Sequence, residues 1–205
     1  MAIRSFLAFE LPAPMKAVLE RSLETMKKIC PDIRWMKVDK IHITVVFLGN
    51  VPEEGLGFIS DAAGTVCARH EPFNLALKGV GVFGPPRRPR VIWAGLDGDI
   101  QRMAGFQREL LKALEPAGIR YDGRPFKPHL TLGRFRDTHR PGAGLKGLLE
   151  MHADIRSDDC RFDELVLFKS DLTPREAIYT VLGRIPIPIA GTTQGQAGFT
   201  DKLEE

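Results

Sequence analysis

The chain has 205 residues, of which 43% are hydrophobic and 27% charged, a balance typical of one folded globular unit. Its formal net charge of +3 at pH 7 suits a polyanionic partner but is lower than expected for a protein that binds long duplexes by charge alone. No apolar run approaches the ~20 residues of a membrane span. The opening MAIRSFLAFEL lacks the apolar segment of a secretion signal, so we expect no contact with a membrane.

Three widely spaced cysteines, Cys30, Cys67 and Cys160, are odd in number. They form no Cys-x-x-Cys pair and no Cys/His set at zinc-ligand spacing. We interpret them as reduced core thiols, which indicates a cytoplasmic protein.

Hydrophobic periodicity in the first 70 residues predicts three strands and two helices. The strands are expected at residues 4–10, 33–37 and 41–48, and the helices at 14–30 and 53–68. Gly49-Asn50 is a turn signal and is expected to end the third strand.

The rest of the chain predicts a hairpin, a helix, a strand, a short helix and a second hairpin. These elements are expected at residues 73–82, 91–96 and 100–114, then directly after Pro128 for the single strand, which a polar connection follows after Arg136, and at 145–152, 160–170 and 177–185. From Ala190 the composition turns to Gly, Thr and Gln, which predicts one domain over 1–189 and a disordered tail over 190–205. The order contains too few βαβ crossovers for a doubly wound sheet, so we expect an α+β fold with largely antiparallel sheets and helices on the outer faces.

One short pattern occurs twice: His42-Ile43-Thr44-Val45 in IHITVVFLG and His129-Leu130-Thr131-Leu132 in FKPHLTLGRF. On a strand, His and Thr two residues apart project from the same face, while the residue between them points the other way. A single such pair is most often a structural histidine in a core. Two copies, 87 residues apart, instead predict two halves of one polar site that face each other across a cleft.

The doubled motif and its surroundings resemble the 2H phosphoesterases, in particular their RNA 2′,3′-cyclic phosphodiesterase branch, once described as 2′-5′ RNA ligases. The similarity extends over most of residues 3–185 and includes RSFLAFELP, RWMKVDKIHITVVFLG, GVGVFGPPRRPRVIWAGL, FKPHLTLGRF and LVLFKSDLTPREAIYTVL. The resemblance implies two pseudo-symmetric lobes with the motif strands lining the groove between them. It also implies that His42 is the proton donor and His129 the acceptor.

Two histidines suit the opening of a cyclic phosphodiester, which needs one proton removed from water and another given to the leaving oxygen. With an ordinary pKa of about 6.5, one imidazole is neutral while its partner is protonated near neutral pH. The hydroxyls of Thr44 and Thr131 can donate to the phosphate oxygens. Neither histidine has further ligands at metal-binding spacing, and no G-x-S-x-G nucleophile elbow is present, so we expect no metal, no cofactor and no covalent intermediate.

Several other residues have two interpretations. Arg134 is a candidate phosphate ligand by resemblance, although regular strand parity turns it away from His129 unless Gly133 forms a bulge. The Arg87, Arg88 and Arg90 loop is either a solvated turn or a contact with an RNA backbone. Three rings near the expected cleft are either core or a platform for a base, namely Phe83, Tyr121 and Phe126. The remaining histidines, His70, His139 and His152, are assigned no role.

The leading hypothesis is an RNA 2′,3′-cyclic phosphodiesterase that leaves a 2′-phosphate and acts as a monomer on RNA ends or on small cyclic nucleotides. Reversible 2′-5′ RNA joining, and hydrolysis of 2′-5′ oligonucleotides, are alternatives within the same chemistry. A non-catalytic module that binds RNA ends is a third possibility, but binding alone does not require two groups with the pKa of histidine.

Overall fold

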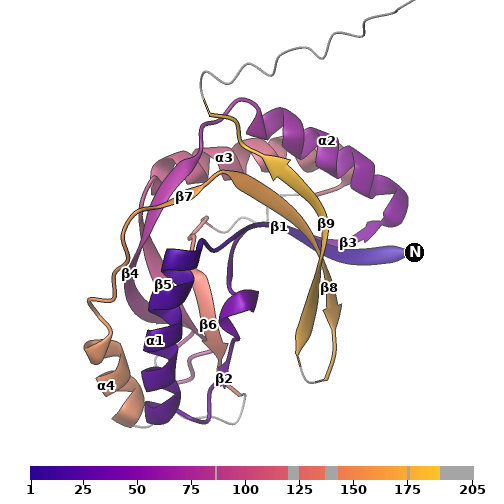
Figure 1. The fold of residues 1–205 in the computed structure, drawn as a ribbon. Coiled ribbons are helices and arrows are strands. Elements are labelled where there is room, and N and C mark those ends of the chain that lie inside the picture. The colour runs from indigo at the N-terminus through magenta and orange to yellow at the C-terminus, as the bar shows by residue number, and fades with distance from the viewer. Residues whose placement is uncertain (86, 120–124, 137–142, 175, 190–205) are drawn as a thin grey trace, which may run out of the picture.

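A computed structural model describes residues 1–85, 87–119, 125–136, 143–174 and 176–189. Its strands form two groups of four that meet at the two motif strands (Figure 1). One group has the order β7-β4-β5-β6 and the other β3-β1-β8-β9, while the short β2 pairs with β6. Every pairing between the described strands is antiparallel. The α+β prediction of two lobes with antiparallel sheets is confirmed.

The strands of the His42 half are β1 (Ala2–Glu10), β3 (His42–Pro52), β8 (Glu164–Leu172) and β9 (Ala177–Pro186). The strands of the His129 half are β2 (Arg34–Trp35), β4 (Phe73–Phe83), β5 (Val91–Gly98), β6 (Leu130–Arg134) and β7 (Cys160–Phe162). The helices are α1 (Ala13–Ile29), α2 (Leu56–Cys67), α3 (Ile100–Leu114) and α4 (Ala143–Met151). Single 3₁₀ turns lie at Val38–Lys40, Glu53–Gly55 and Glu115–Ala117.

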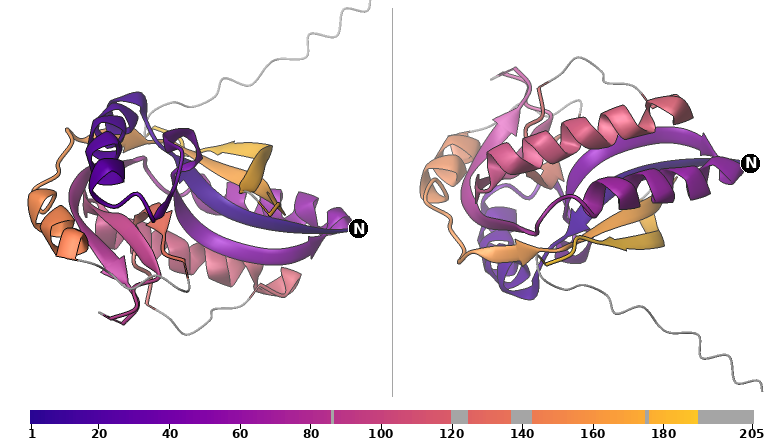
Figure 2. Two further views of the ribbon diagram at one scale, coloured as in Figure 1. Left: turned by 90° about the horizontal axis from the view of Figure 1, so that it is seen from below. Right: turned by 90° about the horizontal axis from the view of Figure 1, so that it is seen from above.

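The helices lie in two pairs. Helix α1 contacts α4 beside the strands of the His129 half, while α2 and α3 pack on each other, α2 against β9 and α3 against β3 and β4 (Figures 1 and 2). Helix α1 forms because its apolar residues recur at helical spacing, and its buried side chains are Met15, Leu19, Leu23 and Met26. None of the helices in the described part of the chain is long and apolar enough to cross a membrane.

Phe9 joins the two halves in one hydrophobic core. Its ring comes from β1 and contacts Phe73 of β4, Phe106 of α3 and Phe162 of β7 at centroid distances of 5.8, 6.1 and 6.0 Å. Phe9 is fully buried. The other face of β1 carries Phe6, so both faces of the strand are covered.

Two predictions of strand bounds were wrong. Strand β3 does not end at Gly49-Asn50 but continues to Pro52, because Gly49 takes a left-handed φ of 74° and the ladder with β1 shifts register there. The expected strand 160–170 is two strands, β7 and β8, which pair in different halves. The backbone carbonyl of Asp163, at the crossover, accepts a hydrogen bond from Ile187 N at 2.7 Å.

Asp99 precedes α3, but its carboxylate caps no helix NH and instead accepts hydrogen bonds from Asn74 N and from Arg102. Cys67 and Cys160 are buried and Cys30 is half-buried, all as free thiols, in line with the cysteine prediction. The proposed tail, 190–205, lies outside the described residues, so the division at residue 189 stays a prediction.

We expect Phe9→Ala to lower the free energy of unfolding by about 3–5 kcal/mol, because it leaves a cavity where the two halves share a core. Urea unfolding followed by far-UV circular dichroism measures the loss. Phe58→Ala is the control, since Phe58 lies on α2 and is 45% exposed. Losses of equal size for the two variants would contradict the role of Phe9.

Candidate active site

The two motif strands meet at one backbone pair, Ile43 with Leu130. Both side chains are fully buried, whereas the His and Thr on either side of each are half-buried. The predicted alternation of core-facing and groove-facing residues is therefore present in both copies. Because the strands run antiparallel about this pair, each His lies on the same side of it as the Thr of the other motif. The pair marks a local pseudo-two-fold axis that relates the histidines.

Each histidine is held by the carbonyl two residues before it. His42 Nδ1 lies 2.9 Å from Lys40 O, and His129 Nδ1 lies 2.7 Å from Lys127 O. A carbonyl oxygen only accepts, so Nδ1 carries the proton in both rings and Nε2 is left as the reactive nitrogen. Within the described part of the chain neither Nε2 makes a hydrogen bond. The two imidazoles are thus equivalently oriented.

Sequence analysis missed these two lysines, although a signal was present. The repeat is longer than His-x-Thr: it is K-I-H-I-T in one copy and K-P-H-L-T in the other. Lys40 also uses its ammonium group, which lies 2.9 Å from the Glu176 carboxylate and 3.0 Å from Ala177 O. This residue therefore connects the start of β9 to the carbonyl that orients His42.

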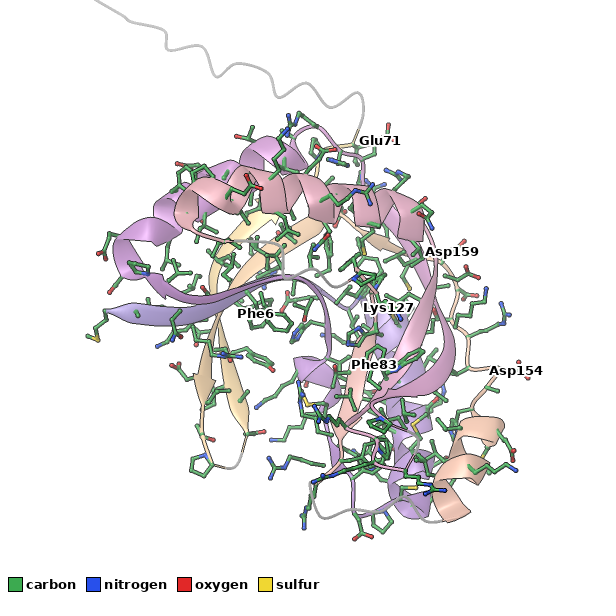
Figure 3. All side chains as sticks on the ribbon, turned by 180° about the vertical axis from the view of Figure 1, so that it is seen from behind. Phe6, Glu71, Phe83, Lys127, Asp154 and Asp159 are labelled. Carbon is green, nitrogen blue, oxygen red and sulfur yellow. The ribbon has the colours of Figure 1, made fainter. Side chains whose placement is uncertain are left out.

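The two histidines contact different aromatic rings, of which Phe6 and Phe83 are labelled in Figure 3. His42 stacks on Phe6 at 4.8 Å, and Tyr179 meets it edge-on at 5.2 Å, with Phe168 behind at 6.1 Å. His129 has Phe83 edge-on at 4.8 Å. The three rings around His42 come from β1, β8 and β9, and no sequence pattern pointed to them.

Burial affects the protonation of both histidines. Burial away from water lowers the pKa of His42 to about 4, with the proximity of His129 adding to the shift and the hydrogen bond to the Lys40 carbonyl opposing it. Burial also lowers the pKa of His129, where the Arg134 charge adds to the shift and the Lys127 carbonyl opposes it. In the free protein both imidazoles are therefore biased toward the neutral form.

A bulge in β6 determines on which face of the strand Arg134 lies. In the ladder between β5 and β6, Trp93 pairs with Thr131 and Val91 pairs with Arg134, so β6 holds one extra residue, Leu132. Residues paired across a ladder share a face, and Val91 and Trp93 are two apart on β5. Arg134 therefore lies on the face of Thr131 and His129. The extra residue is Leu132 rather than the Gly133 considered in the sequence.

The first motif has a bulge at the same place. Ala8 pairs with Thr44 and Leu7 with Val46, so Val45 is the extra residue. In both copies the bulge is the fourth residue of the motif. Beyond this bulge Phe47 pairs with Phe6 on the groove face, where Phe47 is 69% exposed. Phe47 thus occupies the place, five residues after the histidine, that Arg134 occupies in the second copy.

The other candidates are distributed as follows. Phe83 lies at the site, whereas Phe126 packs against the core. Arg90 donates its backbone NH to Phe83 O and accepts from Phe135 N, which places the loop of Arg87 and Arg88 beside the end of β6. Tyr121 and His139 lie outside the described residues.

The histidines without a predicted role make contacts away from the groove. His70 lies 3.3 Å from the Glu109 carboxylate, and His152 bonds to a carbonyl within α4. No group of three or more metal-ligating side chains occurs among the described residues. The expectation of a metal-free site stays a prediction.

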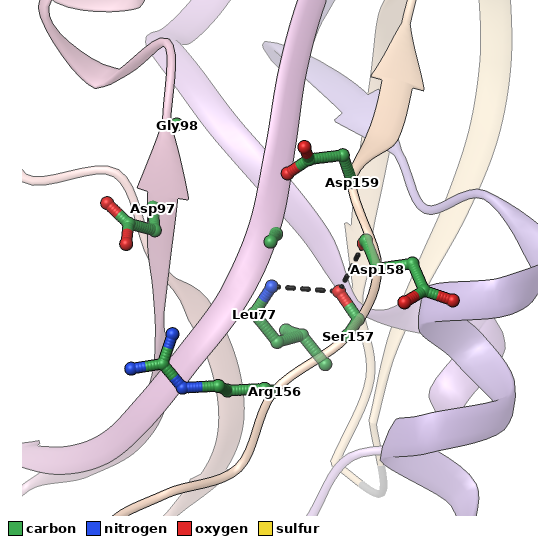
Figure 4. A pocket seen from close by; sticks show the side chains of 8 residues that line it. Leu77, Asp97, Gly98, Arg156, Ser157, Asp158 and Asp159 are labelled. Atoms are coloured by element: carbon green, nitrogen blue, oxygen red, sulfur yellow. Dashed lines mark hydrogen bonds between the residues drawn. The ribbon is translucent and has the colours of Figure 1, made fainter.

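A surface depression between β4, β5 and the segment before β7 is a separate feature (Figure 4). Its polar lining includes Asp97, Arg156, Ser157 and Asp159, and none of the motif residues contributes to it. The Ser157 hydroxyl accepts from Leu77 N and donates to Asp158 O, both at 2.9 Å. These bonds hold the loop on the edge of β4, which accounts for the serine structurally.

With the geometry in place, comparison with known proteins gives the class. Residues 30–174 match the 2′-5′ RNA ligase superfamily, and the chain belongs to this superfamily of 2H phosphoesterases. It is 31% identical over 180 residues to the RNA 2′,3′-cyclic phosphodiesterase of Methanothermobacter thermautotrophicus, covering 88% of this chain and 96% of that protein. The resemblance found in the sequence is confirmed.

Solved structures show the same fold. TT0787 of Thermus thermophilus superposes with a TM-score of 0.73 at 25% identity, covering 92% of this chain and all of that one. LigT of E. coli, crystallised with 3′-AMP, gives a TM-score of 0.69 at 24% identity over 91% of this chain and 99% of that one. The two-lobed architecture is thus that of the superfamily.

The pKa of His42 predicts a pH dependence of stability. The folded pKa of about 4 lies below the unfolded value of about 6.5, so the unfolded state binds more protons between these values. The stabilisation is complete above about pH 6.5 and is lost as the pH falls toward 4. Urea unfolding at pH 7 and pH 5 should show that the free energy of unfolding falls more for the wild type than for His42→Gln as the pH is lowered. Identical losses would contradict a buried, neutral His42.

Proposed function

We propose that this protein hydrolyses RNA 2′,3′-cyclic phosphate ends to 2′-phosphates by general acid–base catalysis with His42 and His129. The observation that carries the proposal is the pair of imidazoles related by a two-fold axis, each held through Nδ1 and each presenting Nε2 on the groove side of the motif strands. The names of the curated relatives support the same activity.

The symmetry suits an in-line displacement. Water enters opposite the 3′ oxygen of the cyclic phosphate, and a neutral imidazole takes its proton as the new P–O bond forms. The 3′ oxygen leaves phosphorus on the far side and receives a proton from the other imidazole, which gives a 2′-phosphate and a free 3′ hydroxyl. Thr44, Thr131 and Arg134 donate to the phosphate oxygens where negative charge increases.

The acid and base roles depend on the environments of the two rings. The family resemblance makes His42 the donor and His129 the acceptor. The deeper enclosure of His42 favours its neutral form in the free protein, which is the form of a base. A bound phosphate anion raises both pKa values, because it stabilises the imidazolium form. Role assignment therefore rests on kinetics of the single variants.

Related reactions use the same groups. Joining of 2′-5′ RNA ends reverses the displacement, with the two histidines exchanging roles, and a 2′-5′ oligonucleotide or a small cyclic nucleotide presents a similar phosphodiester. Product analysis with a 2′,3′-cyclic mononucleotide and with an oligonucleotide ending in a cyclic phosphate separates these activities. Absence of turnover with retained binding would favour an RNA-end binding module. The monomeric state and the cytoplasmic location stay predictions.

His42→Ala and His129→Ala should each lower kcat by about 10²-fold or more, since each removes one proton-transfer partner. Thr44→Ala and Thr131→Ala should cost less, because each removes one neutral donor among several. The effects are measured as kcat for a 2′,3′-cyclic mononucleotide, with wild type and variants assayed after exhaustive chelation of metal ions. His70→Asn is the control, because His70 contacts Glu109 away from the motif strands. Near-normal turnover in either motif variant would remove that histidine from the mechanism.

The pH dependence should be bell-shaped, with its alkaline limb at lower pH in kcat/KM than in kcat. The profile of kcat/KM reports the free protein, where burial lowers both histidine pKa values, whereas kcat reports the complex, where phosphate raises them. The pH profile of each variant's residual activity should lack one limb. The variant without the base should lack the acid limb, and the variant without the acid should lack the alkaline limb. A flat wild-type profile from about pH 5 to 9, with chemistry rate-limiting, would exclude the pair as acid and base.

A further inference from the structure

Two arginines face each other beside the active site. Arg34 of β2 pairs directly with Arg134 of β6, and side chains paired in this way share a face. Arg34 therefore projects from the same face as Arg134, His129 and Thr131, and both guanidinium-bearing side chains are exposed. Like charges directly opposite each other destabilise an antiparallel ladder. This arrangement calls for a counter-charge.

The described part of the protein does not supply that charge. Neither Arg34 nor Arg134 forms an ion pair with any residue described by the structure. Asp32, the acidic residue nearest to Arg34 in sequence, makes no ion pair with either arginine. Its charge adds to the effect of burial, which raises the pKa of the Cys30 thiol. The two cations thus lack a described partner at the edge of the groove, next to the reactive phosphate position.

The His42 half differs in charge. Three of its cations have acidic partners: Arg184 contacts Glu10 at 2.8 Å and also Glu164, Lys40 contacts Glu176 at 2.9 Å, and Lys169 contacts Asp171 at 3.1 Å. At the place that Arg134 holds in the second motif, the first has the exposed ring of Phe47. An aromatic ring provides no ionic contact for a phosphate. The His129 half therefore has two arginines beside its motif strand where the first motif has an aromatic ring.

We propose that Arg34, beside Arg134 at the reacting phosphate, binds the phosphodiester that precedes the cyclic phosphate, so that an RNA strand leaves the groove over β6 and β2 in the His129 half. The inference rests on the proposed function, which places the reacting phosphate between the histidines. Guanidinium groups suit this ligand because their planar NH groups match phosphate oxygens. The loop of Arg87 and Arg88 lies at the same end of β6 and continues the basic surface along the strand.

Arg34→Gln tests the proposal with two substrates. For a trinucleotide ending in a 2′,3′-cyclic phosphate, KM should rise about 5- to 10-fold, and the slope of log(kcat/KM) against log[salt] should weaken by about 0.7, the value for one single-strand phosphate contact. For a 2′,3′-cyclic mononucleotide, which lacks the preceding phosphate, kcat/KM should stay unchanged. Tm should stay the same or rise, because a like-charge pair is removed. Equal effects on both substrates, or a lower Tm, would show a structural role and overturn the proposal.

Arg4→Gln is the matched control. Arg4 is an exposed arginine on β1, at the outer end of the His42 half. It lies on the same face of the strand as Phe6 and Ala8, because the three are alternate residues. It also makes no ion pair with a described residue. We expect its trinucleotide KM and salt slope to match the wild type. If Arg4→Gln raises KM and Arg34→Gln does not, the strand runs over the other half and the proposal is wrong.

A binding measurement separates this proposal from the proposed function. Fluorescence anisotropy with a labelled trinucleotide that ends in a 2′-phosphate requires no turnover. Weaker, less salt-dependent binding to Arg34→Gln supports the arginine pair even if the wild type cleaves neither substrate, a result that would refute only the hydrolase activity. Unchanged binding and unchanged trinucleotide kinetics in Arg34→Gln would overturn the arginine site while leaving the hydrolase intact.

Discussion

The site depends on the pairing of Ile43 with Leu130 at the junction of the two halves. Both side chains are withdrawn from water, and burying two aliphatic side chains stabilises the junction by about 3–6 kcal/mol. Because strand side chains alternate, this burial turns the His and Thr on both sides of each aliphatic residue toward the groove. The chemistry is thus placed by hydrophobic packing. A polar residue at either central position would disturb both halves of the site together.

The fold supplies symmetry, and the neighbouring strands then break it. Both imidazoles are oriented by a backbone carbonyl from the residue two positions earlier, which a side-chain substitution does not remove. The surrounding rings come from unrelated segments and enclose His42 more than His129. Burial disfavours the charged form, so unequal enclosure separates the proton affinities of two identical groups. Such a difference would favour opposite protonation states in the two rings.

The spacing of hydrophobic residues in the sequence predicted most of this architecture, because it follows the periodicity of helices and strands. The face of α1 is an example: Met15, Leu19, Leu23 and Met26 recur at helical spacing and are all buried. This spacing was insufficient where the structure of a segment depends on which other strand it pairs with. Strand β1 alternates weakly because Phe6 and Phe9 are covered on opposite faces. The break at Asp163 reflects a crossover between halves rather than a turn signal in the sequence.

The repeated bulge shows why site residues are harder to predict than strands. An extra residue in a ladder depends on the register with a partner strand, so neither Val45 nor Leu132 differs in type from an ordinary strand residue. Its effect is large, because every side chain beyond it changes face. Arg134 is brought to the histidine by this reversal, and Phe47 is brought to the same place in the other half. Identical geometry with different residues at that place gives a symmetric fold a directional groove, which an asymmetric polymer such as RNA requires.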